Sequence, residues 1–300
     1  MKIAWTFPGQ GSQKPEMADA VLPLSGSKER FALASEILGR DLLRICKGTA
    51  NSNDELSDLN DTRNTQPALF VVESLLIDDF KRQGRKASFV AGHSLGEFVA
   101  LYAAEVIDLK TALVLLKNRS ELMASAGGGA MTAVIGFDRT ELEDLIANTD
   151  GVVIANDNSS GQVVLSGAPD AVGLVAGKLK CKLTVPLKVS GAFHSPFMSK
   201  AADTFSLQLD DVIFNDAIFP VLSNADPTPS IDGKLLRKRL QCQMISGVRW
   251  RETMKNLENL GIETLLEIGP GKVLSGLAKR SIKGVNLNQL SSASDLGHSS

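Results

Sequence analysis

The sequence predicts an α/β protein with a mostly parallel sheet, covered by helices on both faces, into which a small ferredoxin-like unit is inserted. Three observations predict it. Short apolar runs alternate with helical patterns near both ends of the chain, which is typical of parallel sheets. Three consecutive glycines, 127–129, interrupt the composition. From about 127 to 195 the order becomes strand, helix, strand, strand, helix, strand, which is the split βαβ unit.

These patterns predict a large domain formed by residues 1–126 plus 197–300 and a subdomain formed by residues 127–196. The large domain is expected to begin with a buried strand that ends at the turn residues Pro8 to Gln13. Its first elements are, in chain order, a strand at 3–7, helices at 28–38 and 66–83, a strand at 88–91, and helices at 97–104 and 109–124.

The subdomain is expected to contain a strand at 130–136, a helix at 139–147, a hairpin of strands 152–156 and 162–167 around residues 158–161, a helix at 169–179 and a strand at 184–189. The large domain then resumes with strands at 220–223 and 264–268 and helices near 233–244, 250–260 and 272–279. The tail, 291–300, is rich in serine and is expected to fray.

Composition excludes several classes of protein. The 300 residues carry a net charge of −2, and 43% are hydrophobic, so the chain can form a core and has no basic footprint for nucleic acid. The three cysteines are widely spaced, which argues against a disulfide scaffold or a zinc site. No signal segment or membrane span is visible. We expect a cytoplasmic protein.

The turn Gly92-His93-Ser94-Leu95-Gly96 matches the G-x-S-x-G nucleophile elbow. That motif needs a strand before it and a helix after it, and both are predicted here. The strained turn exposes the serine hydroxyl at a helix N-terminus, where the amide of Leu95 is the natural oxyanion donor. A glycine-rich turn with a serine N-cap is the alternative interpretation. The context on both sides favours a nucleophilic Ser94.

A nucleophilic serine needs a base, and the chain has only three histidines. His93 is adjacent to the serine and is expected to pack under the turn. His298 lies in the tail and is expected to be solvated. His194 follows a predicted strand at the junction of the two domains, where clefts form. Elimination therefore favours His194, although a lone histidine is often only a structural residue.

Four motifs occur in a consistent order: Phe7 to Gln13, Gly92 to Glu97, Phe193-His194-Ser195, and Glu267 to Gly271. Together they resemble the malonyl-CoA:acyl carrier protein transacylase family over nearly the whole chain. The resemblance implies an α/β-hydrolase-like large domain with an inserted ferredoxin-like subdomain. It also implies an acyltransferase that moves malonyl from malonyl-CoA to the phosphopantetheine thiol of acyl carrier protein, by a ping-pong mechanism, for fatty acid biosynthesis.

The resemblance implies a role for each site residue. Ser94 would carry the malonyl ester, and His194 would be its base. The backbone amides of Gln10 and Leu95 would form the oxyanion hole. Arg119, otherwise a solvated charge at a helix end, would bind the malonyl carboxylate with two parallel hydrogen bonds. The enzyme would need no cofactor and no metal.

Further roles implied by the resemblance depend on weaker matches. The backbone carbonyl of Arg249 would orient the histidine, although relatives often have glutamine there. Asn156 and Asn158 would contact substrate, or would be ordinary turn residues. The carrier protein is acidic, and two basic clusters could attract it, unless they are solvated helix faces. These clusters are Lys234, Arg237, Lys238 and Arg239, and Lys279, Arg280 and Lys283. No nucleic acid or membrane partner is expected, and we expect a monomer.

Other functions fit less well. A serine esterase or lipase would place its histidine late in the chain, where only His298 stands. A patatin-like lipase would need a Ser–Asp dyad, for which Asp232 is a weak candidate. Gly9-Gln10-Gly11 lacks the third glycine of the dinucleotide motif. A non-catalytic scaffold that binds acyl carrier protein is the remaining alternative.

Overall fold

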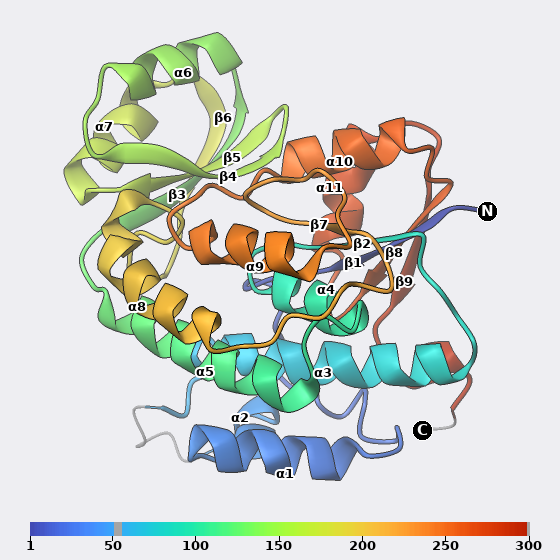
Figure 1. Ribbon diagram of the computed structural model, residues 1–300. Coiled ribbons are helices and arrows are strands. Elements are labelled where there is room, and N and C mark those ends of the chain that lie inside the picture. Colours follow the sequence, from blue (N-terminus) through green and yellow to red (C-terminus); the bar gives the residue numbers. More distant parts are fainter. Residues whose placement is uncertain (51–55, 299–300) are drawn as a thin grey trace.

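The computed structural model describes residues 1–50 and 56–298 and contains two separate sheets (Figure 1). The first is parallel throughout, with strand order β7-β2-β1-β8-β9. Its strands are β1 (Ile3–Phe7), β2 (Phe89–Gly92), β7 (Val221–Leu222), β8 (Thr264–Ile268) and β9 (Asn286–Leu290). The predicted parallel sheet is confirmed.

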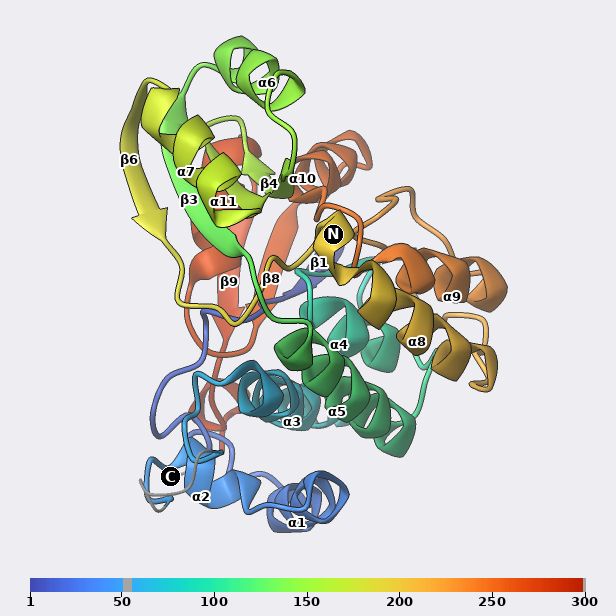
Figure 2. The same cartoon turned by 90° about the vertical axis from the view of Figure 1, so that its left-hand side faces the viewer.

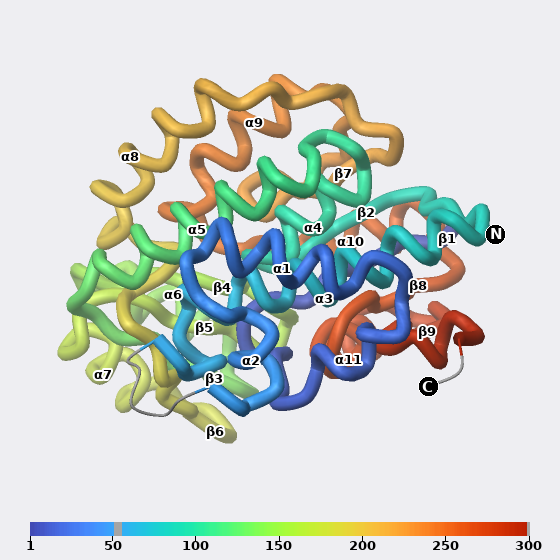
Figure 3. The backbone as a smooth tube through the Cα atoms, turned by 90° about the horizontal axis from the view of Figure 1, so that it is seen from below, coloured from blue at the N-terminus to red at the C-terminus, as the bar shows by residue number. Residues whose placement is uncertain are grey.

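Helices cover both faces of this sheet, and alternation along β1 shows why. Trp5 and Phe7 join the core beneath α3, α4 and α5, whereas Ala4 joins a second core beneath α10 and α11, since successive strand side chains point to opposite faces. Helix α1 lies on the outer side of α3 (Figure 3). The helices are α1 (Ser27–Leu38), α2 (Leu42–Cys46), α3 (Thr62–Arg82), α4 (Gly96–Ala103), α5 (Leu109–Ser125), α8 (Ser199–Asp210), α9 (Gly233–Cys242), α10 (Trp250–Asn259) and α11 (Val273–Ser281).

The second sheet is antiparallel, with strand order β4-β5-β3-β6, and two helices pack on it. Its elements are β3 (Ala130–Phe137), α6 (Arg139–Ala147), β4 (Val152–Ser159), β5 (Gln162–Gly167), α7 (Pro169–Lys178) and β6 (Cys181–Pro186). This order is the predicted ferredoxin-like arrangement. Figure 2 shows β6 at the outer edge of the unit. The domain boundaries at 127 and 196 stay predictions.

A short backbone ladder joins the antiparallel sheet to the segment before α10. The amide of Val248 donates to the carbonyl of Ala155 at 2.7 Å, and the amide of Asp157 donates to the carbonyl of Val248 at 2.9 Å. Arg139 and Arg251 both pair with the Asp157 carboxylate. Strand β4 is therefore fixed against the segment that precedes α10.

Several predicted elements differ from the structure. Helices α2 and α8 and strand β9 were not predicted. The five-residue α2 is too short to show a period, α8 buries two alanines among its few apolar residues, and β9 is a polar edge strand. The strand predicted at 184–189 is β6, which begins three residues earlier, at Cys181. Among the described residues, no helix has the length and apolar character that crossing a membrane requires.

The expectation of a frayed tail is corrected as far as residue 298. Ala293 is buried, and its amide donates to the carbonyl of Ala20 at 2.8 Å. The ring of His298 lies 2.8 Å from the carboxylate of Asp79. His298 is exposed, as expected, but its contact with this buried carboxylate on α3 ties the tail to the helix.

Candidate active site

The elbow between β2 and α4 has the geometry that its glycines imply. Ser94 adopts φ 53°, in the left-handed region that side chains rarely occupy. A Cβ on Gly92 would lie 1.8 Å from the carbonyl oxygen of Gly96, and a Cβ on Gly96 would lie 2.2 Å from that of Phe7. Neither position has room for a methyl group. The turn therefore requires glycine on both sides of the serine.

An asparagine that sequence reasoning missed also holds the elbow. Asn224, two residues after β7, is buried. Its Oδ1 accepts from the amide of Ser94 at 2.7 Å, and its Nδ2 donates to the carbonyl of Gly92 at 2.6 Å. It replaces the hydrogen bonds that the strained turn cannot make internally. Nothing local in the sequence marks Asn224, since it lies 130 residues from the serine.

His194 lies beside Ser94, as elimination predicted. The Ser94 hydroxyl donates to Nε2 of His194 at 2.7 Å, and Nδ1 of His194 lies 2.9 Å from the carbonyl oxygen of Gln243. A carbonyl only accepts, so Nδ1 carries the proton and Nε2 is free to take one. Burial first, and the charge of Arg119 second, lower the pKa of His194 to about 3. The imidazole is thus neutral at pH 7 and suited to act as a base.

The predicted role of Arg249 is corrected. The structure places the carbonyl of Gln243 at His194, whereas the carbonyl of Arg249 accepts from the amide of Thr253 at 3.0 Å. The difference follows from position. Gln243 caps the C-terminus of α9, where carbonyls lack helical partners. Arg249 caps the N-terminus of α10, where the carbonyl enters the first helical turn, and its side chain pairs with Glu252.

Arg119 projects from α5 and is buried, with 1% of its surface exposed. Its Nη2 donates to Oγ of Ser94 at 3.2 Å and to Oε1 of Gln243 at 2.8 Å, and its Nη1 donates to Oε1 of Gln66 at 2.6 Å. Its guanidinium lies 5.4 Å from the ring centre of Phe98. Burial lowers the pKa of Arg119 to about 10, so the group stays charged at pH 7.

A polar chain links this arginine to the loop after β1. Gln66 accepts from Arg119, and its own Nε2 donates to Oγ1 of Thr62 at 2.9 Å. The Thr62 hydroxyl in turn donates to Oε1 of Gln10 at 2.9 Å. Thr62 and Gln66 lie one turn apart on α3, which places them on the same face. Neither was predicted, because neutral residues inside a helix give no local signal.

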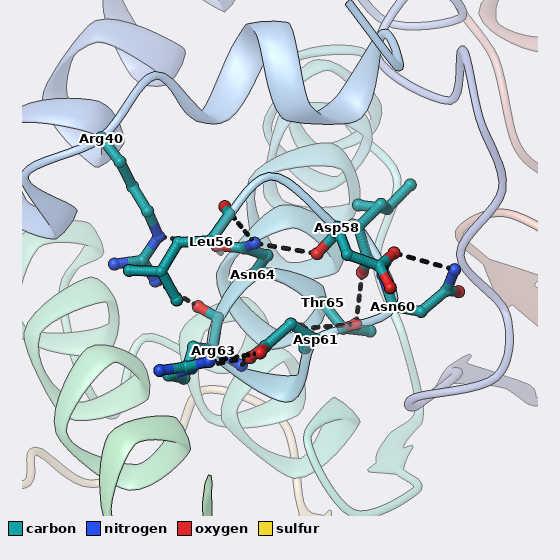
Figure 4. A network of polar contacts seen from close by, with 9 residues as sticks. Arg40, Leu56, Asp58, Asn60, Asp61, Arg63, Asn64 and Thr65 are labelled. Carbon is teal, nitrogen blue, oxygen red and sulfur yellow. Dashed lines mark hydrogen bonds and ion pairs between the residues drawn. The ribbon is translucent and has the colours of Figure 1, made fainter. Parts of the chain in front are cut away.

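The start of α3 is itself fixed by the network in Figure 4. Nδ2 of Asn64 donates to the carbonyls of Leu56 and Asp58, each at 2.8 Å. The hydroxyl of Thr65 donates to the carbonyl of Leu59 at 2.6 Å. Both side chains are fully buried. The first turn of α3 is therefore held in place where its side chains reach the site.

The two predicted oxyanion donors lie close to the serine. A Cβ on Gly9 would lie 2.4 Å from the carbonyl oxygen of His93, so glycine lets the loop after β1 approach the elbow. In the part of the chain that the structure describes, the amides of Gln10 and Leu95 donate no hydrogen bond. Both residues line the cavity that contains Ser94. Two amides without an acceptor among the described residues therefore belong to the residues that line the cavity with Ser94.

The two candidate asparagines, Asn156 and Asn158, have different surroundings in the structure. Asn156 lines the cavity, and its buried Oδ1 has no hydrogen-bond partner among the described residues. Asn158 is buried elsewhere and accepts from Nε2 of His93 at 2.8 Å. The ring of His93 packs 5.4 Å from that of Trp250 and also lines the cavity. Asn156 thus remains a candidate substrate contact, whereas Asn158 holds His93.

The cavity opens beside a wider groove of about 680 Å³ between the loop after β1 and the segment after β6. Gln10, Leu187 and Val189 line both. Apart from Gly11, the other residues that line the groove are polar: Gln13, Asp58, Asn60, Asp61 and Lys188. A long ligand could therefore lie in the groove and present one end to Ser94.

Known proteins resemble this chain over almost its whole length. The sequence-family model described as the acyl transferase domain matches residues 4–297 of this chain. The malonyl CoA-acyl carrier protein transacylase of Synechocystis sp. is 48% identical over 99% of both chains, and the crystal structure of that enzyme superposes with a TM-score of 0.94. A malonyl-transacylase solved with a type II PKS acyl-carrier protein is 34% identical, with a TM-score of 0.88 over 99% of this chain and 98% of its own.

Proposed function

Because the chain belongs to the family of acyl transferase domains, we propose that this acyltransferase moves a malonyl group from malonyl-CoA to the phosphopantetheine thiol of acyl carrier protein. The reaction proceeds through a malonyl ester on Ser94 and supplies extender units for fatty acid biosynthesis. One observation carries the proposal. In one cavity, a neutral imidazole and a buried guanidinium both lie within 3.2 Å of the Ser94 hydroxyl oxygen.

The first half-reaction uses the serine and histidine. Oγ of Ser94 attacks the thioester carbon while Nε2 of His194 takes the hydroxyl proton. The amides of Gln10 and Leu95 stabilise the oxyanion that forms. Collapse of the tetrahedral intermediate breaks the carbon–sulfur bond, and His194 returns the proton to the coenzyme A sulfur. The carbonyl of Gln243 stabilises the imidazolium in between, because it accepts from Nδ1.

Arg119 selects the acyl group in this proposal. The carboxylate of malonyl is only two carbons from the ester carbonyl, so a group that binds it must lie close to the nucleophile. Nη2 of Arg119 satisfies this at 3.2 Å from Oγ. A guanidinium matches a carboxylate with two parallel hydrogen bonds. An acetyl group would leave the buried guanidinium unpaired.

In the second half-reaction the carrier thiol gives its proton to His194 and attacks the ester carbon. Serine then leaves and recovers the proton, and malonyl ends on the carrier sulfur. No cofactor takes part, because malonyl-CoA is a substrate and the phosphopantetheine belongs to the carrier protein. The groove beside the cavity has room for this arm.

Exposure of the side chains supports one of the two basic clusters as the docking site for an acidic carrier. On α9, Arg239 is buried against Asp226, so that cluster is partly internal. On α11, Lys279 and Arg280 are exposed, and Arg280 reaches Gln162 of the antiparallel unit. We favour the α11 cluster. Lys279→Glu combined with Arg280→Glu should raise the KM for carrier protein about tenfold and leave malonylation of Ser94 unchanged.

Separate measurement of the two half-reactions tests the proposal. Mass spectrometry after mixing with malonyl-CoA alone should find one malonyl ester, on the peptide that contains Ser94. Adding phosphopantetheinylated carrier protein should remove that ester and malonylate the carrier. Free malonate without a lasting ester would identify a hydrolase, and no ester and no turnover would identify a scaffold. Either result contradicts the proposal.

A further inference from the structure

Arg119 has an unusual set of partners for a buried cation. Its hydrogen-bond acceptors are two amide oxygens and one hydroxyl, all uncharged. Among the described residues no carboxylate forms an ion pair with it, and its Nε has no partner. A buried charge without a counter-charge is costly. The molecule must therefore compensate this charge in another way or leave the compensation to a ligand.

A buried carboxylate lies on the far side of Gln243 from Arg119. Glu97, in the first turn of α4, is fully buried. Its Oε2 accepts from Nε2 of Gln243 at 2.8 Å and from the amide of Asn224 at 3.2 Å. Burial raises the pKa of Glu97, whereas these hydrogen bonds and the charge of Arg119 oppose that rise. The same pair of charges acts in reverse, since Glu97 raises the pKa of Arg119 against burial.

Gln243 connects the two charges and can do so in only one orientation. Its Nε2 donates to Glu97 and to the carbonyl of Ser94, at 2.8 and 2.9 Å, and its Oε1 accepts from Arg119. A carboxylate and a carbonyl only accept, and a guanidinium only donates. The amide must therefore point its nitrogen at Glu97 and its oxygen at Arg119. An amide satisfies all three partners, whereas a carboxylate at this position would have no donor to offer.

This arrangement positions the guanidinium of Arg119 without binding a carboxylate directly to it. A carboxylate in direct contact would form a two-pronged ion pair with Arg119, and an incoming malonyl carboxylate would then have to displace it. An amide supplies one neutral acceptor and keeps the fixed negative charge on its far side. The charge of Arg119 is thus partly compensated by Glu97 yet remains available to an anion in the cavity.

We propose that the side chain of Gln243 is a specificity-positioning element, which orients Arg119 toward the acyl pocket and keeps the Glu97 carboxylate one hydrogen-bonded residue away from it. The proposal rests on the proposed function, because it assigns the carboxylate-bearing acyl group as the ligand of Arg119. It differs from the role of the Gln243 backbone carbonyl at His194, which any side chain at this position would leave in place.

The test compares the rates at which Ser94 is acylated by malonyl-CoA and by acetyl-CoA, measured by intact-protein mass spectrometry. In Gln243→Glu the malonyl rate should fall about a hundredfold, because the new carboxylate pairs with Arg119. The acetyl rate should fall much less, so the malonyl-to-acetyl ratio should fall at least about tenfold. A purely structural role at the elbow would lower both rates equally and leave this ratio unchanged, which would overturn the proposal.

Two further variants keep the test sharp if Gln243→Glu folds poorly. The exchange Glu97→Gln with Gln243→Glu keeps the same side chains and net charge in swapped places, and we expect the ratio to stay low. Recovery of the wild-type ratio would mean that only total charge matters. Glu97→Gln alone should keep a high ratio, because Arg119 stays free. A fall as large as that in Gln243→Glu would also overturn the proposal.

A matched control adds one negative charge away from the site. Asn288→Asp, exposed on edge strand β9, should leave the ratio unchanged, and a fall there would attribute the effect to net charge alone. Failure of the proposed function looks different from all of these results. In that case the wild-type protein would form no ester on Ser94 with either thioester.

Discussion

Ser94 and Arg119 line one cavity and are hydrogen-bonded, with Oγ and Nη2 3.2 Å apart, yet different kinds of structure hold them. The serine wall is made of backbone: a strained turn, two glycines without room for a methyl group, and a loop pressed against it. The arginine wall is made of side chains from separate helices, joined by amide hydrogen bonds. The first wall is fixed by steric contact of the backbone together with the two hydrogen bonds of Asn224, and the second by hydrogen bonds between side chains alone.

The difference teaches how one fold can keep its chemistry while changing its substrate. A wall fixed by backbone contact tolerates almost no substitution. A wall fixed by side chains can exchange an arginine, an amide or a carboxylate without moving the chain. We therefore expect the serine wall to govern whether an acyl ester forms and the arginine wall to govern which acyl group forms it.

Removal of the nucleophile should have the largest effect. Ser94→Ala deletes the hydroxyl that the elbow carries and that Arg119 contacts. Acylation by malonyl-CoA and by acetyl-CoA should fall by about 10⁴-fold or more. Thermal unfolding should change little, since the side chain lies in an open cavity. An acyl adduct that persists in the variant on another residue would contradict the assignment of Ser94.

Breaking the backbone of the serine wall should come next. Gly92→Ala places a methyl group 1.8 Å from the carbonyl oxygen of Gly96, so the turn must deform. We expect a loss of about 3 kcal/mol or more in the free energy of unfolding and a fall in both acylation rates. Gly173→Ala on α7 is the matched control, because no heavy atom lies within 4 Å of the added Cβ. It should stabilise the protein by up to about 1 kcal/mol.

The smallest expected effect is on the pH profile, where the two walls interact. Because the pKa of His194 is lowered to about 3, the imidazole is neutral at every pH well above that value. Acetylation of Ser94 should therefore stay nearly constant from about pH 8 down to about pH 5. A wild-type rate that halves near pH 6.5, the ordinary value for histidine, would contradict this account.

The charge of Arg119 is the second cause of the lowered pKa. Its removal should raise the pKa of His194, so the acid limb of the acetylation profile should move to higher pH in Arg119→Met. Acetyl-CoA is the right probe, since its acyl group has no carboxylate for Arg119 to bind. An unchanged profile would mean that the two walls are electrostatically independent.

The contrast between the walls also explains what the sequence could predict. The elbow was predictable because its steric demands fall on five consecutive residues, of which two must be glycine. Most of the order of strands and helices was predictable because most strands are apolar runs, whereas the polar edge strand β9 gave no such signal. His194 followed from the scarcity of histidine rather than from any local pattern.

The arginine wall was much harder to predict. The sequence alone favoured a solvated Arg119, and only the family resemblance proposed a binding role, because burial depends on packing between distant helices. Gln66, Asn224 and Gln243 are neutral amides far from Ser94 in the sequence, so nothing marks them as polar partners. The prediction of Arg249 failed for a related reason: a free carbonyl depends on where α9 ends, and helix ends are poorly defined by sequence.

One measurement tests the division of labour between the walls most directly: the rates of Ser94 acylation by malonyl-CoA and acetyl-CoA in the wild-type protein and in Arg119→Ala. The account predicts that the variant loses about 2–5 kcal/mol of transition-state binding for malonyl, about thirtyfold to several thousandfold in rate, while acetylation falls far less. An equal loss for both thioesters would contradict it, because Arg119 would then support the nucleophile and not choose the acyl group.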